Sequence, residues 1–518
     1  MKFLPIFMSL LVTTGFCFAK KMPAPGPFRL GDVLVRVSAT EMTTAEISAY
    51  MPETRSLFVV GGEKIMEIVD VADPVNPKVK QAVALPGGAS SVTVNGNFVA
   101  VSLLANPEWK RGQVQVMRYD GNLQILGTFD VCYQPDMITF TPDGKNLLVA
   151  CEGSPDAEFR EDPEGGIAIL SIGEGTSWKS PSIAVAGFAE LDSAALMAQG
   201  VRRTGTQGFV RSLEPEYITV SDDSRTAWVS LQENNAIAVV DIAAKKVTDV
   251  YPLGFVDHAI PGFGLDVKSN SRIEIENYPL RGLRQPDGIS AFTVGGRPFI
   301  ATANEGAPVN DYKAWTDVST LPMLLQQKRL DPKVFNDAFV SELANLSVSS
   351  LESCDAVPDK QANGLCPYAY TFGSRSMSIF DGSTGALIWD SGDMLERTIA
   401  KVAPDFFNWN SKKKKLKMDS RSEDKGCEPE NVTVGEVGGK RYAFVGLERT
   451  SAIVVFDITD VGKSHNPSPK IVDFYLNPVD RGPEGVLFIP AEKSPVKGTA
   501  LLVVGYEYNK TLTIFKVK

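Results

Sequence analysis

A repeated hairpin with an acidic residue at each end of its open side is the feature that most constrains this sequence. The clearest copy opens with Pro215 and Glu216, turns at residues 222–224, and ends at Glu233. Two strands of about six residues joined by a short turn bring their outer ends side by side. The sequence therefore predicts a hairpin that holds Glu216 and Glu233 together at its open end.

The same unit occurs in seven places along the chain, and each hairpin is followed by a third apolar run. One copy, residues 89–105, has the strands but neither acid. The other acid pairs are Glu46 and Glu63, Asp136 and Glu152, Asp287 and Glu305, Glu430 and Glu448, and Glu484 and Glu507. Repeated small antiparallel sheets indicate a radial architecture. We therefore predict an all-β fold, a seven-bladed β-propeller with short helical insertions.

The last copy has only three strands before the sequence ends. The alternating segment Phe28–Ser38 could supply the fourth, because closing the ring removes edge strands. We expect residues 20–39 to form a lead and closing strand, and residues 40–518 the propeller. Insertions are expected near residues 179–210, 306–370 and 394–426, with helical runs at 190–199 and 321–346 and a short helix after Met394.

The first 19 residues have one early lysine, an apolar core and a final alanine, as secretory signal peptides do. Cleavage near Ala19 would leave a periplasmic or secreted protein. The alternative, a lipoprotein signal at Cys17, is disfavoured by the bulky Phe16. No other apolar run approaches the ~20 residues that a membrane-spanning helix needs.

CxxC metal spacing is absent, so we interpret the cysteines as structural disulfides. Disulfides of this kind form in an oxidising compartment. Cys354 and Cys366 flank a loop of turn residues, and we expect a disulfide between them. Cys132 and Cys151 lie beside Asp136 and Glu152 and could also pair. Cys427 is left over.

Charge and motifs exclude several classes of function. A net charge of −10 argues against nucleic acid as the main partner. With only two histidines, His-rich metal sites and His-based triads are disfavoured. No GxSxG elbow accompanies His258, for which we expect a structural, hydrogen-bonded role. No dinucleotide or P-loop motif opens a helix.

The run Lys412–Lys415 predicts a solvated loop, with a polyanion or lipid headgroup as the alternative ligand. We expect a monomer.

The acid pairs should gather around one mouth of the central channel, because the first strand of each blade lines it. The predicted metal ligands are Asp136, Glu152, Glu216, Glu233, Asp287, Glu305, Glu430, Glu448, Glu484 and Glu507, with Glu46 and Glu63 beside them. Two bare carboxylates 4 Å apart repel by about 4 kcal/mol at an effective dielectric near 20. Such a ring must bind cations, take up protons or pair with bases, for which Arg284, Lys425, Arg449 and Arg481 are candidates. The alternative is that each acid caps backbone N–H groups of its own blade.

Oxygen ligands without His or Cys favour Ca²⁺, with Mg²⁺ as the other candidate. Two function classes follow. One is a secreted Ca²⁺-binding module for extracellular matrix, cell-surface or phosphorylated ligands. The other is a metal-dependent phosphoester hydrolase, in which the basic residues clamp a phosphate and a carboxylate activates water.

Several motifs also carry a family resemblance. They are Leu213-Glu214-Pro215-Glu216, the segment Gly254–Asp266, Gln285-Pro286-Asp287, Ala303-Asn304-Glu305-Gly306, Glu428-Pro429-Glu430, Gly446-Leu447-Glu448-Arg449, Gly482-Pro483-Glu484-Gly485 and Phe488-Ile489-Pro490-Ala491-Glu492. Together they resemble the choice-of-anchor I domain across roughly residues 45–518. That family includes the mesenchyme-specific cell-surface glycoproteins of biomineralising animal cells, and some bacterial members are labelled alkaline phosphatase or phytase-like.

The resemblance implies an exported seven-bladed propeller, often with calcium, and no settled reaction. Two departures restrict what carries over. The acid-rich stretch usual after the Gly-Leu-Asp motif is here Val267–Arg272, which puts in doubt any metal that relatives hold there. The usual C-terminal sorting anchor is not expected, because the sequence stops at its last strand.

Overall fold

The computed structural model describes residues 26–518 except 174–176, 311, 352–363 and 414. The predicted signal peptide, with Cys17 and its cleavage site, lies outside the described residues. Among the described residues, no helix is long and apolar enough to cross a bilayer.

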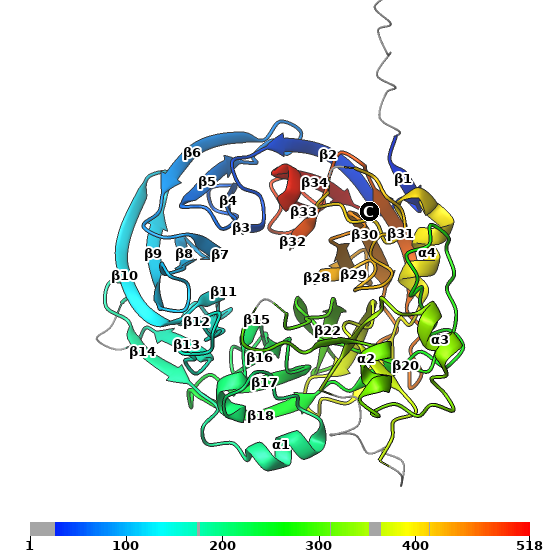
Figure 1. The fold of residues 1–518 in the computed structure, drawn as a ribbon. Helices are drawn as coiled ribbons and strands as arrows, with labels where there is room; N and C mark the ends of the chain where they lie inside the picture. Colours follow the sequence, from blue (N-terminus) through cyan, green and yellow to red (C-terminus); the bar gives the residue numbers. More distant parts are fainter. Residues whose placement is uncertain (1–25, 174–176, 311, 352–363, 414) are drawn as a thin grey trace, which may run out of the picture.

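Antiparallel sheets follow one another around a ring, and each is built largely from strands that are consecutive in the chain (Figure 1). The first sheets contain β3 (Ile47–Met51), β4 (Ser56–Val60), β5 (Ile65–Asp70) and β6 (Lys78–Ala84); β7 (Ala89–Asn95), β8 (Phe98–Leu103), β9 (Arg111–Tyr119) and β10 (Leu123–Tyr133); and β11 (Pro135–Phe140), β12 (Asn146–Cys151), β13 (Gly166–Ser171) and β14 (Ser182–Ala186).

The chain then forms β15 (Pro215–Val220), β16 (Thr226–Leu231), β17 (Ala236–Asp241) and β18 (Lys246–Pro252); β21 (Ile289–Val294), β22 (Arg297–Asn304), β26 (Ser376–Asp381) and β27 (Leu387–Asp390); β28 (Pro429–Val437), β29 (Lys440–Leu447), β30 (Ala452–Asp457) and β31 (Lys470–Leu476); and β32 (Pro483–Ile489), β33 (Ala500–Tyr506) and β34 (Thr511–Val517). Each predicted hairpin is present as the first two strands of one sheet. All-β structure is therefore confirmed.

The two chain ends meet in the last sheet. Strand β2 (Leu34–Glu41) pairs antiparallel with β34, from Leu34 opposite Val517 to Glu41 opposite Thr511. The prediction of one strand over residues 28–38 was wrong at its start, because β1 (Phe28–Leu30) pairs with β31 in the neighbouring sheet. Gly31 separates the two strands with a positive φ of 81°. A Cβ there would lie 2.1 Å from the Val472 carbonyl oxygen, so only glycine fits this turn.

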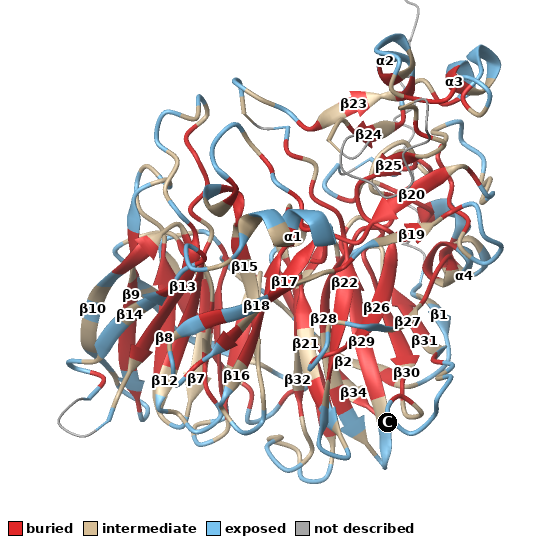
Figure 2. Ribbon diagram, turned by 90° about the horizontal axis from the view of Figure 1, so that it is seen from below, coloured by how far each residue is buried: buried red, intermediate tan, exposed pale blue. Residues whose placement is uncertain are grey.

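The apolar core lies between neighbouring sheets, as Figure 2 shows by the buried middle strands. All five residues of β4 and all seven of β33 are buried, whereas the outer strand β6 is almost fully exposed. First strands face the centre of the ring. There a pocket of about 420 Å³ is lined by residues of β3, β7, β11 and β32 and by Tyr217 of β15.

A separate lobe rises above one end of the ring (Figure 2). It contains β19 (Phe255–Asp257), β20 (Leu280–Leu283), β23 (Val318–Thr320), β24 (Ser347–Ser349), β25 (Ala369–Thr371), α2 (Leu321–Gln326) and α3 (Asp337–Glu342). Leu321, Phe335 and Leu346 belong to its own apolar core. The predicted helical run 321–346 was wrong as a single helix. Pro332 lies between α2 and α3, and proline disfavours helix at the residue before it.

The other predicted helices are present as α1 (Ser193–Gln199) and α4 (Met394–Val402). The Asp192 side chain caps α1 by accepting hydrogen bonds from two backbone N–H groups, and Gly200 ends it in the left-handed conformation. Short 3₁₀ turns occupy Phe209–Ser212, Pro404–Phe406 and Glu507–Asn509.

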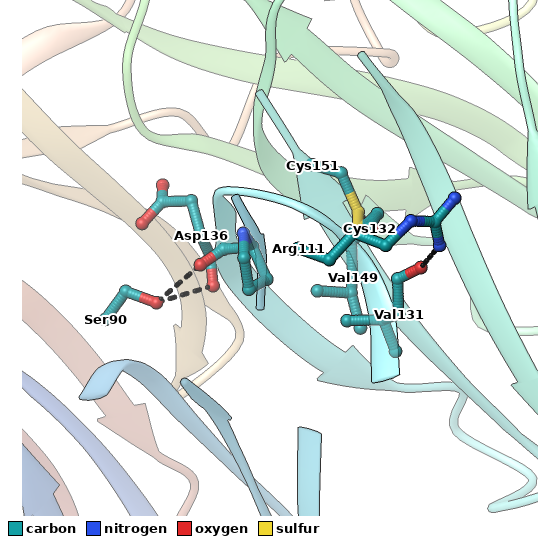
Figure 3. The surroundings of a disulfide bond; sticks show 8 residues. Ser90, Arg111, Val131, Cys132, Asp136, Val149 and Cys151 are labelled. Carbon is teal, nitrogen blue, oxygen red and sulfur yellow. Dashed lines mark hydrogen bonds between the residues drawn. A yellow bond between two sulfur atoms is a disulfide. The ribbon is translucent and has the colours of Figure 1, made fainter. Parts of the chain in front are cut away.

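Cys132 and Cys151 form a disulfide, with their Cα atoms 5.9 Å apart (Figure 3). Cys366 is also disulfide-bonded, but the predicted partner Cys354 lies outside the described residues. Cys427 is a buried free thiol. His258 is buried, and its Nδ1 lies 2.6 Å from the Phe263 carbonyl oxygen, which fits the expected structural role.

Candidate metal site at the ring mouth

Four hairpins share one strand register at their open ends. The ladder pairs Pro135 with Cys151, Pro215 with Leu231, Pro429 with Leu447, and Pro483 with Tyr506. In each hairpin the register then shifts before the residue three positions on, so the acid after the proline lies in a β-bulge. The second acid follows the paired residue by one position, or by two in Glu233. The hairpin geometry therefore places both acids of a pair at the same end of the ring.

Glycine after the first acid brings neighbouring sheets close at this end. Gly288 N donates to Glu430 O at 2.9 Å, and Gly485 N donates to Glu46 O at 3.1 Å. A Cβ on Gly288 would lie 2.7 Å from Asn431 Cα, and one on Gly485 would lie 2.4 Å from Glu46 O. The absence of a side chain at these two positions lets one first strand dock on the next.

We call the resulting group of carboxylates the acidic mouth. Its members are Glu46, Asp136, Glu152, Glu214, Glu216, Glu233, Asp287, Glu305, Glu428, Glu430, Glu448, Glu484 and Glu507. Figure 3 shows the Asp136 carboxylate directed away from the Cys132–Cys151 disulfide. The backbone carbonyls of Pro135 and Asp136 accept hydrogen bonds from Ser90, 2.9 and 3.2 Å away, which fix this strand start.

Burial and mutual repulsion raise the pKa values of most of these acids. Burial, then nearby carboxylates, raises the pKa of Glu46 to about 7. Burial raises the pKa of Asp136 to about 6 and that of Asp287 to about 7. Burial and neighbouring acids also hold the pKa values of Glu216, Glu430 and Glu484 well above the usual range. The mouth therefore favours protons or cations over bare carboxylates.

In the part of the chain that the structure describes, three overlapping groups of carboxylates have ligand oxygens within 4.8 Å of one another. We call them the inner group (Asp287, Glu305, Glu430), the middle group (Glu305, Glu428, Glu448) and the outer group (Glu448, Glu484, Glu507). In the inner group, Glu430 is only 8% exposed. Its Oε2 atom is buried and accepts from no donor group among the described residues, and the Asp287 carboxyl group lies in hydrogen-bond contact with Glu430, a contact that requires a proton on one of the two acids. This buried oxygen lacks the partner that a carboxylate needs.

The middle group is neutralised by three bases. Glu428 is fully buried and accepts from Arg421 Nε at 2.7 Å. Lys425 Nζ and Arg449 Nε each lie 3.2 Å from its Oε2. These cations outweigh burial and lower the pKa of Glu428 to about 2. The sequence prediction did not include Glu428 or Arg421.

Lys425 and Arg449 also contact Glu305 and Glu448, the two acids that the middle group shares with the inner and outer groups. Lys425 Nζ contacts Glu305 Oε1, and Gln232 Nε2 donates to Glu305 Oε2 at 2.8 Å. Arg449 Nη1 lies 2.5 Å from Glu448 Oε1, which also accepts from the Tyr508 hydroxyl. Lys425 and Arg449, two of the four basic candidates, thus contact members of the acidic mouth.

Arg284 and Arg481 do not join it. Arg284 is buried and pairs with Asp390 at 3.1 Å, and it donates to the carbonyl oxygens of Leu253 and Phe255. Arg481 donates to the Ser411 carbonyl oxygen at 2.9 Å. Glu63, placed beside the predicted ligands, forms an ion pair with Lys510 and lies close enough to Glu46 and Glu507 for its charge to raise the pKa of both.

A second part of the mouth is organised by Ser154. Its Oγ lies 2.9 Å from Glu152 Oε2 and 2.8 Å from Glu214 Oε2. The Ser154 hydroxyl has one proton and can donate only one of these two hydrogen bonds. The second hydrogen bond therefore needs a proton on one of the two carboxyl groups. Burial raises the pKa of both Glu152 and Glu214 well above the usual range, consistent with a shared proton. Glu216 and Glu233 each have one buried oxygen without a hydrogen-bond partner among the described residues.

The sequence prediction also did not include Glu214. The signal that could have found the two omitted acids, Glu214 and Glu428, is the Glu-Pro-Glu motif, which occurs at residues 214–216 and 428–430. In each case the acid before the proline joins the mouth together with the acid after it. The prediction included only the acid after the proline, Glu216 or Glu430.

Comparison with known proteins identifies relatives over much of the chain. A model of the family described as the choice-of-anchor I domain matches residues 46–461. The chain is 31% identical over 284 residues to a mesenchyme-specific cell surface glycoprotein of Strongylocentrotus purpuratus, covering 49% of this chain and 36% of that protein. It is 27% identical over 207 residues to Gigasin-3a of Magallana gigas, covering 37% of this chain and 69% of that protein. The match thus spans only about a third of the first relative.

Among solved structures, a chain of the hydrazine synthase of Kuenenia stuttgartiensis aligns with 93% of this chain and 99% of its own length. The TM-score is 0.47 and the sequence identity is 13%.

Proposed function

This chain belongs to the choice-of-anchor I domain family, and on that premise we propose an exported β-propeller of seven blades that binds Ca²⁺ at its acidic mouth and serves as an extracellular binding module. Export is supported by the cell-surface relative and by the Cys132–Cys151 disulfide, which suits an oxidising compartment. Seven blades are supported by the repeated hairpins and by β2, which supplies a fourth strand beside β34.

The observation that carries the proposal is the unpartnered oxygen of Glu430. It lies in a group of three acids, of which only Glu305 has a base in contact among the described residues. Leaving a buried carboxylate unpaired costs several kcal/mol, so a proton or a cation must occupy this place. Asp287, Glu305 and Glu430 would hold one ion, and Glu448, Glu484 and Glu507 would hold a second.

The donor set favours calcium over other metals. All the candidate ligands are carboxylate oxygens, and neither His nor Cys joins any of the three groups. Oxygen donors suit Ca²⁺, which accepts irregular geometry and six to eight ligands, whereas Mg²⁺ demands a small octahedral shell. Zinc would favour nitrogen or sulfur ligands.

The proposal is tested by calorimetric titration of Ca²⁺ into metal-free protein. We expect binding with a dissociation constant of about 10⁻⁴–10⁻³ M, as in extracellular modules. Glu430→Gln should remove the inner site, whereas Glu492→Gln, at an exposed acid, should bind as the wild type does. Equal binding by the wild type and Glu430→Gln, or no binding by either, would refute the proposed site.

A second candidate function is a metal-dependent phosphoester hydrolase. It is favoured by the contacts of Lys425 with Glu305 and of Arg449 with Glu448, which place two cations beside proposed metal ligands. Turnover of a phosphomonoester that requires Ca²⁺ and falls in Arg449→Gln would support it. Calcium binding without turnover leaves the binding module as the function.

A further inference from the structure

A polar pocket of about 400 Å³ borders the middle group. Three basic residues line it, Arg421, Lys425 and Arg449, together with the acids Glu305 and Asp424. Val318 and Ser347 of the separate lobe also line it, as does Asn310 on the segment that leads into the lobe. The pocket therefore has more basic than acidic side chains, in a mouth that is otherwise acidic.

Each of the three bases is paired in the metal-free protein. Lys425 contacts Glu305 and Glu428, and Arg449 contacts Glu428 and Glu448. Arg421 pairs with Glu428, and its NH1 lies 2.6 Å from Asp424 Oδ2. Their charge is therefore compensated within the protein.

Two of these pairings involve proposed calcium ligands. Glu305 belongs to the inner group and Glu448 to the outer group. A carboxylate that donates its oxygens to Ca²⁺ has less charge to offer an ammonium or guanidinium group. Lys425 and Arg449 would then keep only the Glu428 carboxylate, which they share with Arg421, and arginine stays charged at all relevant pH values, so the three cations are left short of negative charge. Metal binding on either side would thus uncover positive charge in the pocket between them.

We propose that this pocket binds a phosphate dianion, and that calcium held by the inner and outer groups switches the binding on. The inference rests on the proposed calcium function and adds the ligand class. Guanidinium groups bind phosphate through paired hydrogen bonds, and Lys425 supplies a third cation. Phosphate alone fills only part of the pocket, so the group can also be carried by a larger molecule.

The test is a titration of inorganic phosphate into the full chain, with calcium chelated and with calcium present below the point of precipitation. We expect phosphate affinity to rise by at least about tenfold when calcium is present. Because coupling between two ligands is reciprocal, phosphate must raise calcium affinity by the same factor. Phosphoserine in place of inorganic phosphate distinguishes a free ion from a phosphorylated partner.

Four variants identify the pocket. Arg449→Gln should lose phosphate binding. Asn310→Asp, at an exposed position on the rim, adds a negative charge without touching the ion pairs and should weaken phosphate more than Asn310→Ala does. Lys413→Gln, at an exposed lysine outside the pocket lining, is the control: it removes one positive charge, as Arg449→Gln does, and should bind phosphate normally.

The outcomes separate this inference from the proposed function. Calcium binding without phosphate binding overturns the pocket and leaves the calcium site intact. Phosphate binding that is equal with and without calcium overturns the switch. Calcium binding that fails in the wild type overturns the proposed function itself. Equal phosphate binding by the Asn310→Asp and Asn310→Ala variants would place the anion elsewhere.

Discussion

The carboxylates of Asp287 and Glu430 lie within 4.8 Å of each other, although they arise from different sheets. The backbone enforces this approach, because Gly288 donates its N–H to the Glu430 carbonyl oxygen. Burial raises the pKa of both side chains, and the neighbouring Glu305 carboxylate raises the pKa of each further. The fold thus builds an acidic contact that favours occupation by a positive charge.

Gly288→Ala tests whether this approach is built into the fold. The added Cβ would lie 2.7 Å from Asn431 Cα and 3.0 Å from Glu430 O. Such overpacking costs about 1–3 kcal/mol, so the free energy of unfolding measured in denaturant should fall by that amount. The control is Gly187→Ala, where nothing lies within 4 Å of the new Cβ. Equal stability of the two variants would contradict close docking at Gly288.

Acid should stabilise the metal-free protein. The folded-state pKa values of Glu46 and Asp287, each about 7, exceed those of the unfolded chain, where the usual values are 4.5 and 3.8. The folded protein therefore binds more protons, and the stability from these groups is lost as the pH rises from about 4 through about 7. We expect the melting temperature in a chelator to be lower at about pH 8 than at about pH 5.

Calcium should oppose that loss, because the ion and the protons compete for the same oxygens. The rise in melting temperature on adding calcium should accordingly be larger at about pH 8 than at about pH 5, by mass action on the deprotonated form. A rise of the same size at both pH values would mean that calcium binds away from the carboxyl groups with raised pKa.

Strand β2 should be required for a closed ring. A chain beginning at Met42 would expose the edge of β34 and remove the ion pair between Arg36 and Asp480, whose oxygen is 3.0 Å away. Asp480 would then be buried without its cation, which is strongly destabilising. We expect this truncation to melt far below a chain beginning at Gly26, and to associate through the open edge. Equal melting of the two chains would contradict closure by β2.

Much of this fold could be predicted from sequence because the hairpin repeat is local. Alternating apolar residues and turn residues determine each strand pair, and third strands such as Gly166–Ser171 have the bounds that their apolar runs suggest. The division of residues 28–41 into β1 and β2, in two different sheets, could not be predicted from the local residue pattern. It depends on the contact of Gly31 with Val472, a residue far along the chain. The helical run after Leu321 was overestimated because its apolar pattern continued past Pro332.

The sequence predicted which acids make up the candidate site, but not which of them are paired with basic side chains. Hairpin register accounts for the positions of Glu430 and Glu448. The pairing of Lys425 with Glu305 depends on how a long insertion folds back on the ring, which no local pattern encodes. Arg284 illustrates the reverse case. It stands next to a predicted ligand motif, yet Asp390 and two carbonyl oxygens take its donors.

The most direct test of the calcium site is a crystal structure of the protein grown with calcium, with anomalous diffraction to locate the ion. We predict a peak bound by Asp287 and Glu430, with calcium–oxygen distances of about 2.3–2.6 Å. Crystals in millimolar calcium that show no ion between these two carboxylates, with Glu430 protonated or paired to a base instead, would contradict it.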